Sequence, residues 1–464
     1  ADNETDRENR RAAISQPPGV GPVRGVYPFK GKVYCFRDQN DNTAGFFESS
    51  STGWIQITTP TRTAGGRYEF APYNFKATAS TEVLIGTDGI NPAFIWDGSS
   101  FTEISIPGES DPPTFCAVIS NYLFLGMEKG VLYYSVVGEP TDFDSANGAG
   151  AIGAGGFITN ISPLVGGGLA VLMRERVSIL QGNGPSDWSE SNLRNHDAKV
   201  GGEPYTAVLY NQLYYLDERG ITNLAATEAF GSFASLTISA GVNSFITDRQ
   251  NLVQASALSR RKNQLRWLFN PRAGDTGSEV LSATFNGNSL VGYSLQKYDH
   301  KINVIEESVF PDGSEVMVAG TNDGWVMRMD KGNSFDGEPI EAYIRTPFIQ
   351  FQSPQKRKKF LNLILNIETI GNVDIRVKPE FSYSSPDLIG HPASPASVIG
   401  GGGFWGEDQW NEFKWSAQLN AEGYVDIAGT GKNLALTIYN KSDQSAPFTI
   451  YETLIYYIMR NWYR

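Results

Sequence analysis

The sequence has few of the residues on which most enzyme and metal sites depend. It contains two cysteines and three histidines among 464 residues. The histidines, His196, His300 and His391, stand in separate segments without the spacing of a metal motif. No phosphate-binding glycine loop and no Gly-x-Ser-x-Gly motif occurs. We therefore expect no metal, no cofactor and no catalytic residues, and predict that the protein is not an enzyme.

Two further absences concern the cell compartment and the membrane. No run of about 18 apolar residues exists, so no membrane-spanning segment is expected. The charged start of the chain has no apolar stretch like that of a signal peptide. Cys35 and Cys116 lie far apart in the sequence. This favours two free, buried thiols in a protein made in the cytoplasm.

Positive charge is also scarce, with 38 basic against 50 acidic residues and a net charge of −12. An ordinary nucleic-acid-binding protein needs a basic surface, so this balance argues against one. Two interpretations remain open. The acidity either keeps a large protein soluble or provides a surface that lets a polyanion pass without holding it.

What the sequence does contain is a repeated β pattern. Aromatic residues make up 12% of the chain, with 49 glycines and 24 prolines, as in a turn-rich β protein. Short strand-like runs, bounded by turns such as Asp88-Gly89 and Asp97-Gly98, recur about every 40 residues. This period predicts an all-β fold with a β-propeller of six to eight blades, seven favoured. We expect the ring to close by borrowing a strand from one end. A series of β-sandwiches and a β-helix are the rival folds.

The repeat stops near residue 337, and longer strands follow it. We predict an N-terminal arm at 1–24, a propeller at 25–337 and a C-terminal antiparallel β-sandwich-like domain at 338–464. The polar start of the arm, residues 1–18, cannot build a core and is expected to order only against a partner. Its deletion should then leave the melting of the propeller unchanged.

Two segments are candidate interaction sites. The densest basic cluster consists of Lys356, Arg357, Lys358 and Lys359, and it predicts an electrostatic contact with an acidic partner or neighbouring subunit. The alternative is a solvated loop. Trp405 and Trp410 follow a run of glycines, so this loop either inserts into a neighbour or packs its aromatic residues locally.

Several segments, taken in order, resemble the tail nozzle (tail hub) proteins of short-tailed bacteriophages and related prophages, a β-propeller family that stabilises packaged DNA. The resemblance covers most of residues 21–368 and is weak beyond them. It rests on residues 21–25 with 33–34, on Val-Leu-Tyr-Tyr-Ser at 131–135 followed by Glu-Pro-Thr-Asp-Phe at 139–143, and on 169–182, 201–225, 323–337, 340–348 and 355–361.

The resemblance implies a structural virion protein. Such a protein forms a ring, a homohexamer, at the distal end of the phage tail, where it retains packaged DNA and conducts it during ejection. The ring would dock beneath a tail adaptor protein and contact tail fibre or needle proteins. DNA would pass without sequence-specific binding. The protein would be made in the host cytoplasm and reside in the virion. The chain has no obvious insertion for the extra tip domains that some members carry.

Two functions of other classes compete with this one. A carbohydrate-binding or glycan-cleaving propeller could use Trp54, Trp96 and Trp188 to stack on sugars, with carboxylates facing each other across the channel. The same tryptophans would otherwise fill the spaces between blades. A scaffold propeller that binds peptides is the third possibility.

Overall fold

The computed structural model describes residues 3–78, 81–197, 199–226, 233–332, 334–369, 372–383, 392–399, 420–442 and 448–460. The chain divides into two compact units. One unit is Arg11–Asp330, and the other combines Ala1–Arg10 with Lys331–Arg464. The second unit thus begins at Lys331, ahead of the boundary at 338 that the sequence suggested.

The unit Arg11–Asp330 contains seven antiparallel sheets within its described residues, and each is built from strands consecutive in the sequence. The first three sheets are β1 (Val23–Phe29), β2 (Lys32–Asp38), β3 (Thr43–Ser50) and β4 (Gly53–Thr63); β5 (Glu69–Tyr73), β6 (Val83–Thr87), β7 (Phe94–Trp96) and β8 (Phe101–Glu103); and β9 (Phe115–Ile119), β10 (Tyr122–Gly126), β11 (Val131–Tyr134) and β12 (Gly150–Gly153).

The remaining four sheets continue the series. They are β13 (Ile158–Pro163), β14 (Leu169–Met173), β15 (Val177–Leu180) and β16 (Leu193–Asp197); β17 (Val208–Leu209), β18 (Leu213–Asp217), β19 (Gly220–Ala226) and β20 (Phe233–Thr237); β21 (Val253–Ser259), β22 (Gln264–Phe269), β23 (Glu279–Asn286) and β24 (Ser289–Lys297); and β25 (Ile302–Val309), β26 (Glu315–Thr321) and β27 (Val326–Arg328).

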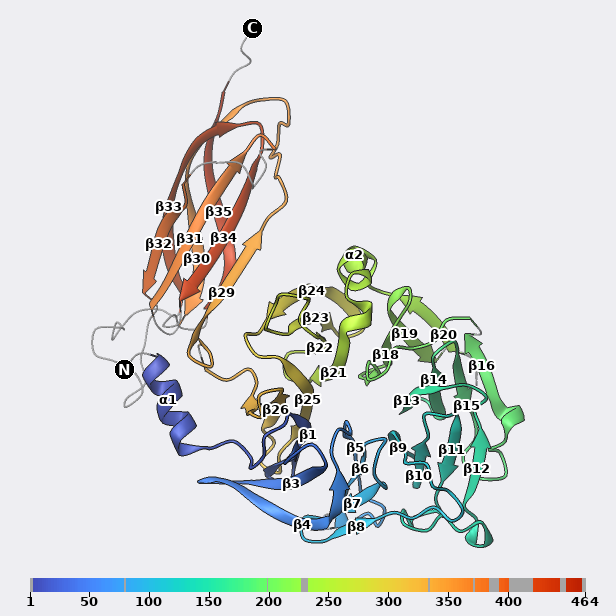
Figure 1. Ribbon diagram of the computed structural model, residues 1–464. Coiled ribbons are helices and arrows are strands. Elements are labelled where there is room, and N and C mark those ends of the chain that lie inside the picture. The colour runs from blue at the N-terminus through green and yellow to red at the C-terminus, as the bar shows by residue number, and fades with distance from the viewer. Residues whose placement is uncertain are drawn as a thin grey trace. The chain divides into compact units, whose positions relative to one another are not determined.

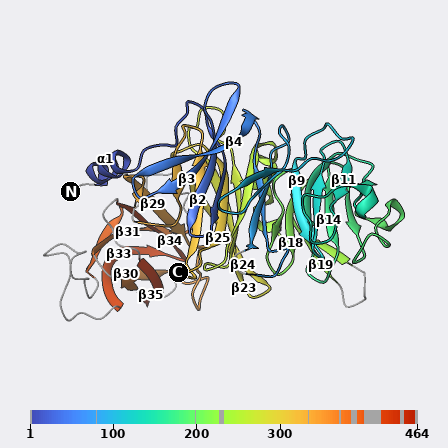
Figure 2. The ribbon, with the colours of Figure 1, turned by 90° about the horizontal axis from the view of Figure 1, so that it is seen from below.

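The seven sheets follow one another around a ring (Figure 1), and their strands run along the axis of that ring (Figure 2). A hydrophobic core fills the space between each pair of neighbouring sheets. Alternation along the strands supplies both sides of each sheet. On β2, for example, Tyr34 and Phe36 pack toward the second sheet, whereas Cys35 packs toward the seventh. The fold is therefore a seven-bladed β-propeller, which confirms the prediction from the repeat.

The ring closes through side-chain packing between the first and last blades. Val23 and Val26 share a core with Val304, Val316 and Val318. In the described residues β1 pairs only with β2, and the seventh blade has three strands of its own. The expectation that closure borrows a strand from one end was therefore wrong. Apolar packing between the first and seventh blades, here called the closure seam, takes the place of a strand shared between them.

The second unit is a sandwich of two antiparallel sheets. Its core comes from both sheets and includes Leu363, Leu365, Ile375, Val425 and Leu436. One sheet has the order β28 (Ser334–Phe335), β29 (Glu338–Arg345), β34 (Leu434–Ser442), β31 (Asn372–Phe381) and β32 (Ser394–Ile399); the other has the order β33 (Asn420–Gly431), β30 (Lys358–Thr369) and β35 (Phe448–Met459). This agrees with the C-terminal β-sandwich that the longer strands predicted.

The start of the chain differs from the expected arm. It forms the helix α1 (Asn3–Ala13), whose Arg7 pairs with Glu338 at 3.2 Å. Glutamate, arginine and alanine are good helix formers, which explains a helix in a segment without a core of its own. The expectation that this segment orders only against a partner was therefore wrong.

Residues 16–21 also contribute to the propeller. Arg37 is 3% exposed, and its guanidinium donates to the side-chain oxygen of Gln16 at 3.0 Å, to the carbonyl of Pro17 at 2.5 Å and to the carbonyl of Gly21 at 2.9 Å. Loss of these acceptors would leave a buried cation without hydrogen bonds. The expectation that residues 1–18 can be removed without effect on the propeller no longer follows.

Helices are few and short. The remaining ones in the described residues include α2 (Asn243–Thr247) and the 3-10 helices Ser145–Asn147, Glu190–Asn192, Ala240–Val242 and Gln250–Leu252. None of the helices in the described ranges has the length and apolar character needed to cross a bilayer.

Candidate functional site

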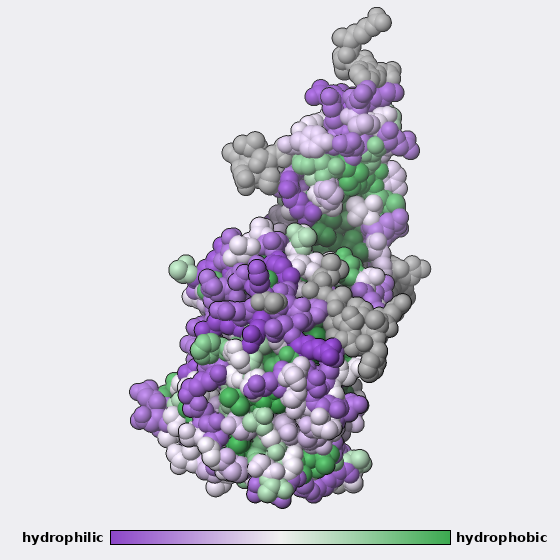
Figure 3. Space-filling model, turned by 90° about the vertical axis from the view of Figure 1, so that its right-hand side faces the viewer, coloured by the Kyte–Doolittle hydropathy of each residue, from purple (hydrophilic) through white to green (hydrophobic). Residues whose placement is uncertain are grey.

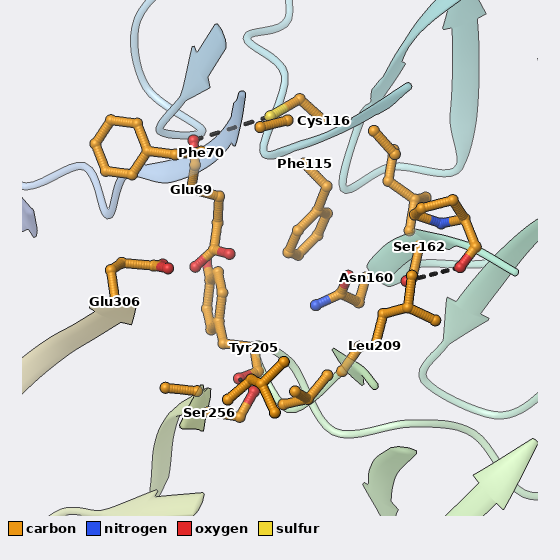
Figure 4. Close-up of a pocket in the computed structure, with 18 of the residues that line it drawn as sticks. Glu69, Phe70, Phe115, Cys116, Asn160, Ser162, Tyr205, Leu209, Ser256 and Glu306 are labelled. Carbon is orange, nitrogen blue, oxygen red and sulfur yellow. Dashed lines mark hydrogen bonds between the residues drawn. The ribbon is translucent and has the colours of Figure 1, made fainter. Parts of the chain in front are cut away.

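A cavity of about 430 Å³ lies on the axis of the propeller. Residues of six blades line it, and most of them belong to the first strand of their blade: β5, β9, β13, β17, β21 and β25. Side chains from segments far apart in the sequence therefore meet in this one place (Figure 4). We refer to it as the axial cavity.

Two guanidinium groups in the axial cavity are already paired. Arg67 lies 3.1 Å from the carboxylate of Glu69, and its guanidinium stacks 3.8 Å from the ring centre of Tyr205. It also donates to the backbone carbonyl of Gln254. Arg260 lies 3.3 Å from Glu307. These contacts fix both cations on the cavity wall, each beside its own carboxylate.

Glu306 is the carboxyl group without such a cation. Within the described residues it has no hydrogen bond and no ion pair, and it points toward Glu69 (Figure 4). Burial raises the pKa of Glu306 well above its usual range, and the charge of Glu69 raises it further. Burial likewise raises the pKa of Glu69, and that of Glu307 to about 7. The cavity therefore holds carboxyl groups that keep protons to higher pH than ordinary glutamates.

The thiol at the cavity wall is not set up as a nucleophile. Cys116 is a free cysteine whose sulfur lies 3.9 Å from the carbonyl of Glu69. Burial raises its pKa to about 12, so the thiolate is scarce at neutral pH. Cys35, the other cysteine, is also free and is buried at the closure of the ring. Within the described residues, no group of three or more His, Cys, Asp or Glu side chains is arranged to hold a metal ion.

The tryptophans considered for sugar stacking fill the spaces between blades. Trp96 is 3% exposed in the core between the first two blades, and Trp188 is 5% exposed between the third and fourth. Trp54 packs against the core at the ring closure. Their faces are occupied by protein neighbours, which leaves little aromatic surface for a sugar.

The basic cluster separates into two kinds of residue. Arg357 and Lys359 are exposed and Lys356 is half-buried, whereas Lys358 is fully buried. The ammonium group of Lys358 donates to the carbonyls of Ser353 at 2.6 Å, Lys356 at 3.2 Å and Lys432 at 2.7 Å. Burial lowers its pKa. The prediction that all four side chains offer charge to a partner is wrong for Lys358, which holds loops of its own unit together. Trp405 and Trp410 lie outside the described residues.

A second candidate site is the solvent-facing side of the three-stranded sheet in the sandwich. Ile364 of β30 stands between Tyr424 of β33 and Leu454 of β35 in register. Tyr424 is 64% exposed, and Tyr456 and Ile458 continue the apolar row with 48% and 55% of their surfaces exposed. We call Ile364, Tyr424, Leu454, Tyr456 and Ile458 the outer sheet face. Figure 3 likewise shows hydrophobic residues gathered on a side of this unit.

Charged residues flank the outer sheet face. Glu422 and Asp426 point outward on either side of Tyr424, and Glu452 lies on β35, where Asn366 donates to it at 2.9 Å. Tyr424 donates to Glu422 at 2.8 Å. An apolar centre with a charged rim is the usual composition of a protein–protein interface.

Two features of the sequence point to the axial cavity and to the outer sheet face, although the repeat pattern alone did not predict either site. Glu306 and Glu307 interrupt the apolar run of β25, and a charge inside a strand of an otherwise apolar core marks a special environment. The tyrosines and isoleucines of β35 occupy both faces of the strand, where an edge sheet exposed to water would carry polar residues on one.

No protein-family model and no curated protein matches this chain. Among solved structures, the chain is similar to the computationally designed Ika8 protein, with 12% identity over 68% of this chain and 98% of that one, at a TM-score of 0.42. It is also similar to BBS1N in complex with ARL6DN, with 14% identity over 68% of this chain and 93% of that one, at 0.43. A third is the extracellular domain of the putative one component system BT4673 from B. thetaiotaomicron, with 12% identity over 82% and 43% of the two chains, at 0.42. These likenesses concern the fold and carry nothing about function.

Proposed function

We propose that this chain is a structural virion protein of a short-tailed bacteriophage. It assembles into a homohexameric ring at the distal end of the tail, retains the packaged DNA and conducts it during ejection. It has no enzymatic activity, is made in the host cytoplasm and functions in the virion. A tail adaptor protein above the ring, and fibre or needle proteins at its tip, are the partners that this role implies.

The positions of the resembling segments support this proposal. Residues 131–135 include β11, residues 169–182 form the β14–β15 hairpin, and residues 201–225 include the β18–β19 hairpin. Residues 323–325 make the turn between β26 and β27. The segments thus fall on the third, fourth, fifth and seventh blades in chain order, as a shared propeller architecture would allow.

The main support for assembly into a ring is the outer sheet face. We assign it to the contact with a neighbouring copy of this chain. Its rim is acidic at Glu422, Asp426 and Glu452, while Arg357 and Lys359 present positive charge at the start of β30. One chain thus supplies both positive and negative charge, as a head-to-tail contact between identical subunits requires. Such a contact generates a closed ring when its rotation closes.

The charge of the chain suits a conduit. DNA carries about one negative charge per 1.7 Å of its axis, so a basic bore would bind it tightly and slow its passage. An assembly of chains that each carry a net charge of −12 repels the phosphates instead. The ring of packed blades provides a rigid wall.

A matched pair of substitutions tests this interface. Ile458→Ser removes an apolar side chain from the outer sheet face, and Ile55→Ser removes one from β4 of the propeller; both isoleucines are 55% exposed. Native mass spectrometry should show the ring for wild type and Ile55→Ser, but smaller species for Ile458→Ser. Intact rings in both variants would exclude this face as the subunit contact.

The exposed part of the basic cluster allows a second test. Joint replacement of Lys356, Arg357 and Lys359 by Ser should weaken ring formation or docking, and should neither create nor remove affinity for DNA. Lys358 is kept, because its loss would disturb the fold. If the wild-type ring bound duplex DNA at physiological salt and this variant did not, the cluster would be a DNA contact and the proposal for it would be wrong.

The alternative is a carbohydrate-binding or glycan-cleaving propeller. Its support is the pair of carboxyl groups, Glu69 and Glu306, that face each other in the axial cavity. Glu69 is already paired with Arg67, and the three tryptophans pack between or against blades. Saturable binding of a glycan by a monomeric chain would favour this alternative.

A further inference from the structure

When its three glutamates are ionised, the axial cavity carries one negative charge more than its cations balance. The charged residues that line it are Arg67, Glu69, Arg260, Glu306 and Glu307. Arg67 pairs with Glu69 and Arg260 pairs with Glu307, at 3.1 and 3.3 Å. Glu306 remains, and a half-buried carboxylate without a cation is neutralised either by a proton or by a bound cation.

A second polar side chain in the cavity, that of Asn160, also has no hydrogen-bond partner among the described residues. Asn160 of β13 is 9% exposed, and its amide points into the cavity (Figure 4). Among the described residues nothing hydrogen-bonds to that amide. Buried amides in folded proteins are normally hydrogen-bonded, so this amide is available to water or to a ligand in the cavity. Asn160 and Glu306 come from different blades, so this feature is independent of the carboxyl groups.

We propose that the axial cavity binds a small organic cation of the alkylammonium class. The ammonium group contacts the carboxylate of Glu306 and donates to the amide oxygen of Asn160. An ammonium has three donors and no acceptor, which matches two oxygen-bearing side chains. The alkyl part lies against the apolar wall, which includes Ala71, Ile161 and Ala257.

The size and the ligands of the cavity favour this class over others. The cavity of about 430 Å³ falls within the usual range for small-molecule sites. Calcium needs six to eight oxygen ligands and magnesium a near-ideal octahedron, more than these two side chains supply. An anion would meet the surplus negative charge. This inference does not depend on the proposed role in the virion.

Binding should tighten as the pH rises. The ligand needs the ionised form of Glu306, whereas burial favours the protonated form by raising the pKa of this group. Glu69 and Glu307 raise that pKa further, and Arg67 lowers it. Cys116 and Tyr205, with pKa values of about 12, stay neutral. The cation must therefore displace a proton, and it does so more readily at higher pH.

Isothermal titration calorimetry on the full chain tests the proposal, with n-butylammonium chloride as the probe and n-butanol as the neutral analogue of the same shape. Saturable binding of the amine but not the alcohol is expected, tighter at about pH 8 than at about pH 6. Glu306→Gln should weaken it by about tenfold or more, and Asn160→Ala by less. Glu175→Gln removes an exposed carboxylate from the β14–β15 turn and should leave binding unchanged.

Three outcomes would overturn the proposal. Equal binding of n-butanol would show that the positive charge of the amine contributes nothing to binding. Unchanged affinity in a folded Glu306→Gln variant, with its thermal melting recorded, would place the amine elsewhere. Calcium binding that Glu306→Gln abolishes, without amine binding, would make the site a metal site. The oligomeric state of the wild-type protein is measured separately, so failure here leaves the ring proposal standing.

Discussion

Val23 of the first blade and Gly320 of the last blade meet where the propeller closes. A methyl group built on Gly320 would lie 2.5 Å from Cγ1 of Val23 and 2.9 Å from Cγ2 of Val304. This contact joins the two ends of the propeller sequence, where no backbone ladder is formed and the side chain of Asn303 donates to the carbonyl of Val23 at 3.4 Å. The stability of the whole ring should therefore depend on the space at Gly320.

Gly320→Ala should push the first and last blades apart. We expect a loss of about 1–3 kcal/mol in the free energy of unfolding, the usual effect of overpacking. Urea unfolding followed by tryptophan fluorescence measures it. Gly292→Ala on β24 is the control, because no atom lies within 4 Å of its new methyl group. Equal stability of the two variants would show that the closure seam is loose.

Lys358 should stabilise the sandwich and its neighbour Lys359 should not. Lys358→Met removes a buried ammonium that donates to three backbone carbonyls, so the second unit should lose about 3 kcal/mol or more. Lys359→Met changes an exposed side chain of the same type and should shift stability by about 0.5 kcal/mol or less. Differential scanning calorimetry measures the unfolding transition of the second unit in both variants. If both variants melt alike, the carbonyl contacts contribute nothing.

Two truncations should separate the helix α1 from the segment that follows it. Deletion of residues 1–10, which lie outside the propeller unit, keeps Arg11 on the ring of Trp325 and the acceptors of Arg37, and should leave the melting of the propeller unchanged. Deletion of residues 1–18 removes Gln16 and Pro17, which accept from the buried Arg37. We expect it to cost about 1–3 kcal/mol in propeller stability. An identical melting temperature for both truncations would contradict this assignment.

The stability of the propeller should fall as the pH rises from about 5 to about 8. The folded chain keeps protons on Glu306 and Glu307, since their pKa values are raised, the latter to about 7. The unfolded chain releases these protons near pH 4.3, so it binds fewer protons across this range, and unfolding becomes easier as the pH increases.

Glu306→Gln removes one of these groups and should flatten the fall in the urea midpoint between about pH 5 and about pH 8. The variant should also be more stable than wild type at the upper end, because a buried charge is lost. Glu175→Gln removes one exposed carboxylate and serves as the charge-matched control. A variant with the wild-type pH dependence would mean that Glu306 is not buried in the folded protein.

The sequence predicted what depends on local pattern. Turn dipeptides such as Asp88-Gly89 and the alternation along strands such as β2 led to hairpins, and their period led to seven blades. Features that depend on distant contacts could not be predicted. The closure at Val23 and Gly320, and the cavity that Glu306 and Asn160 both line, bring together residues far apart in the chain. The prediction for Lys358 was wrong because the three basic residues beside it in the sequence suggested that the whole cluster is exposed.

The most direct test of the account is the mass and shape of the purified chain. Native mass spectrometry with negative-stain electron microscopy should reveal a ring of six copies around a central bore, as a tail nozzle requires. A monomer that binds a glycan saturably, and forms no ring at any accessible concentration, would contradict the proposed function.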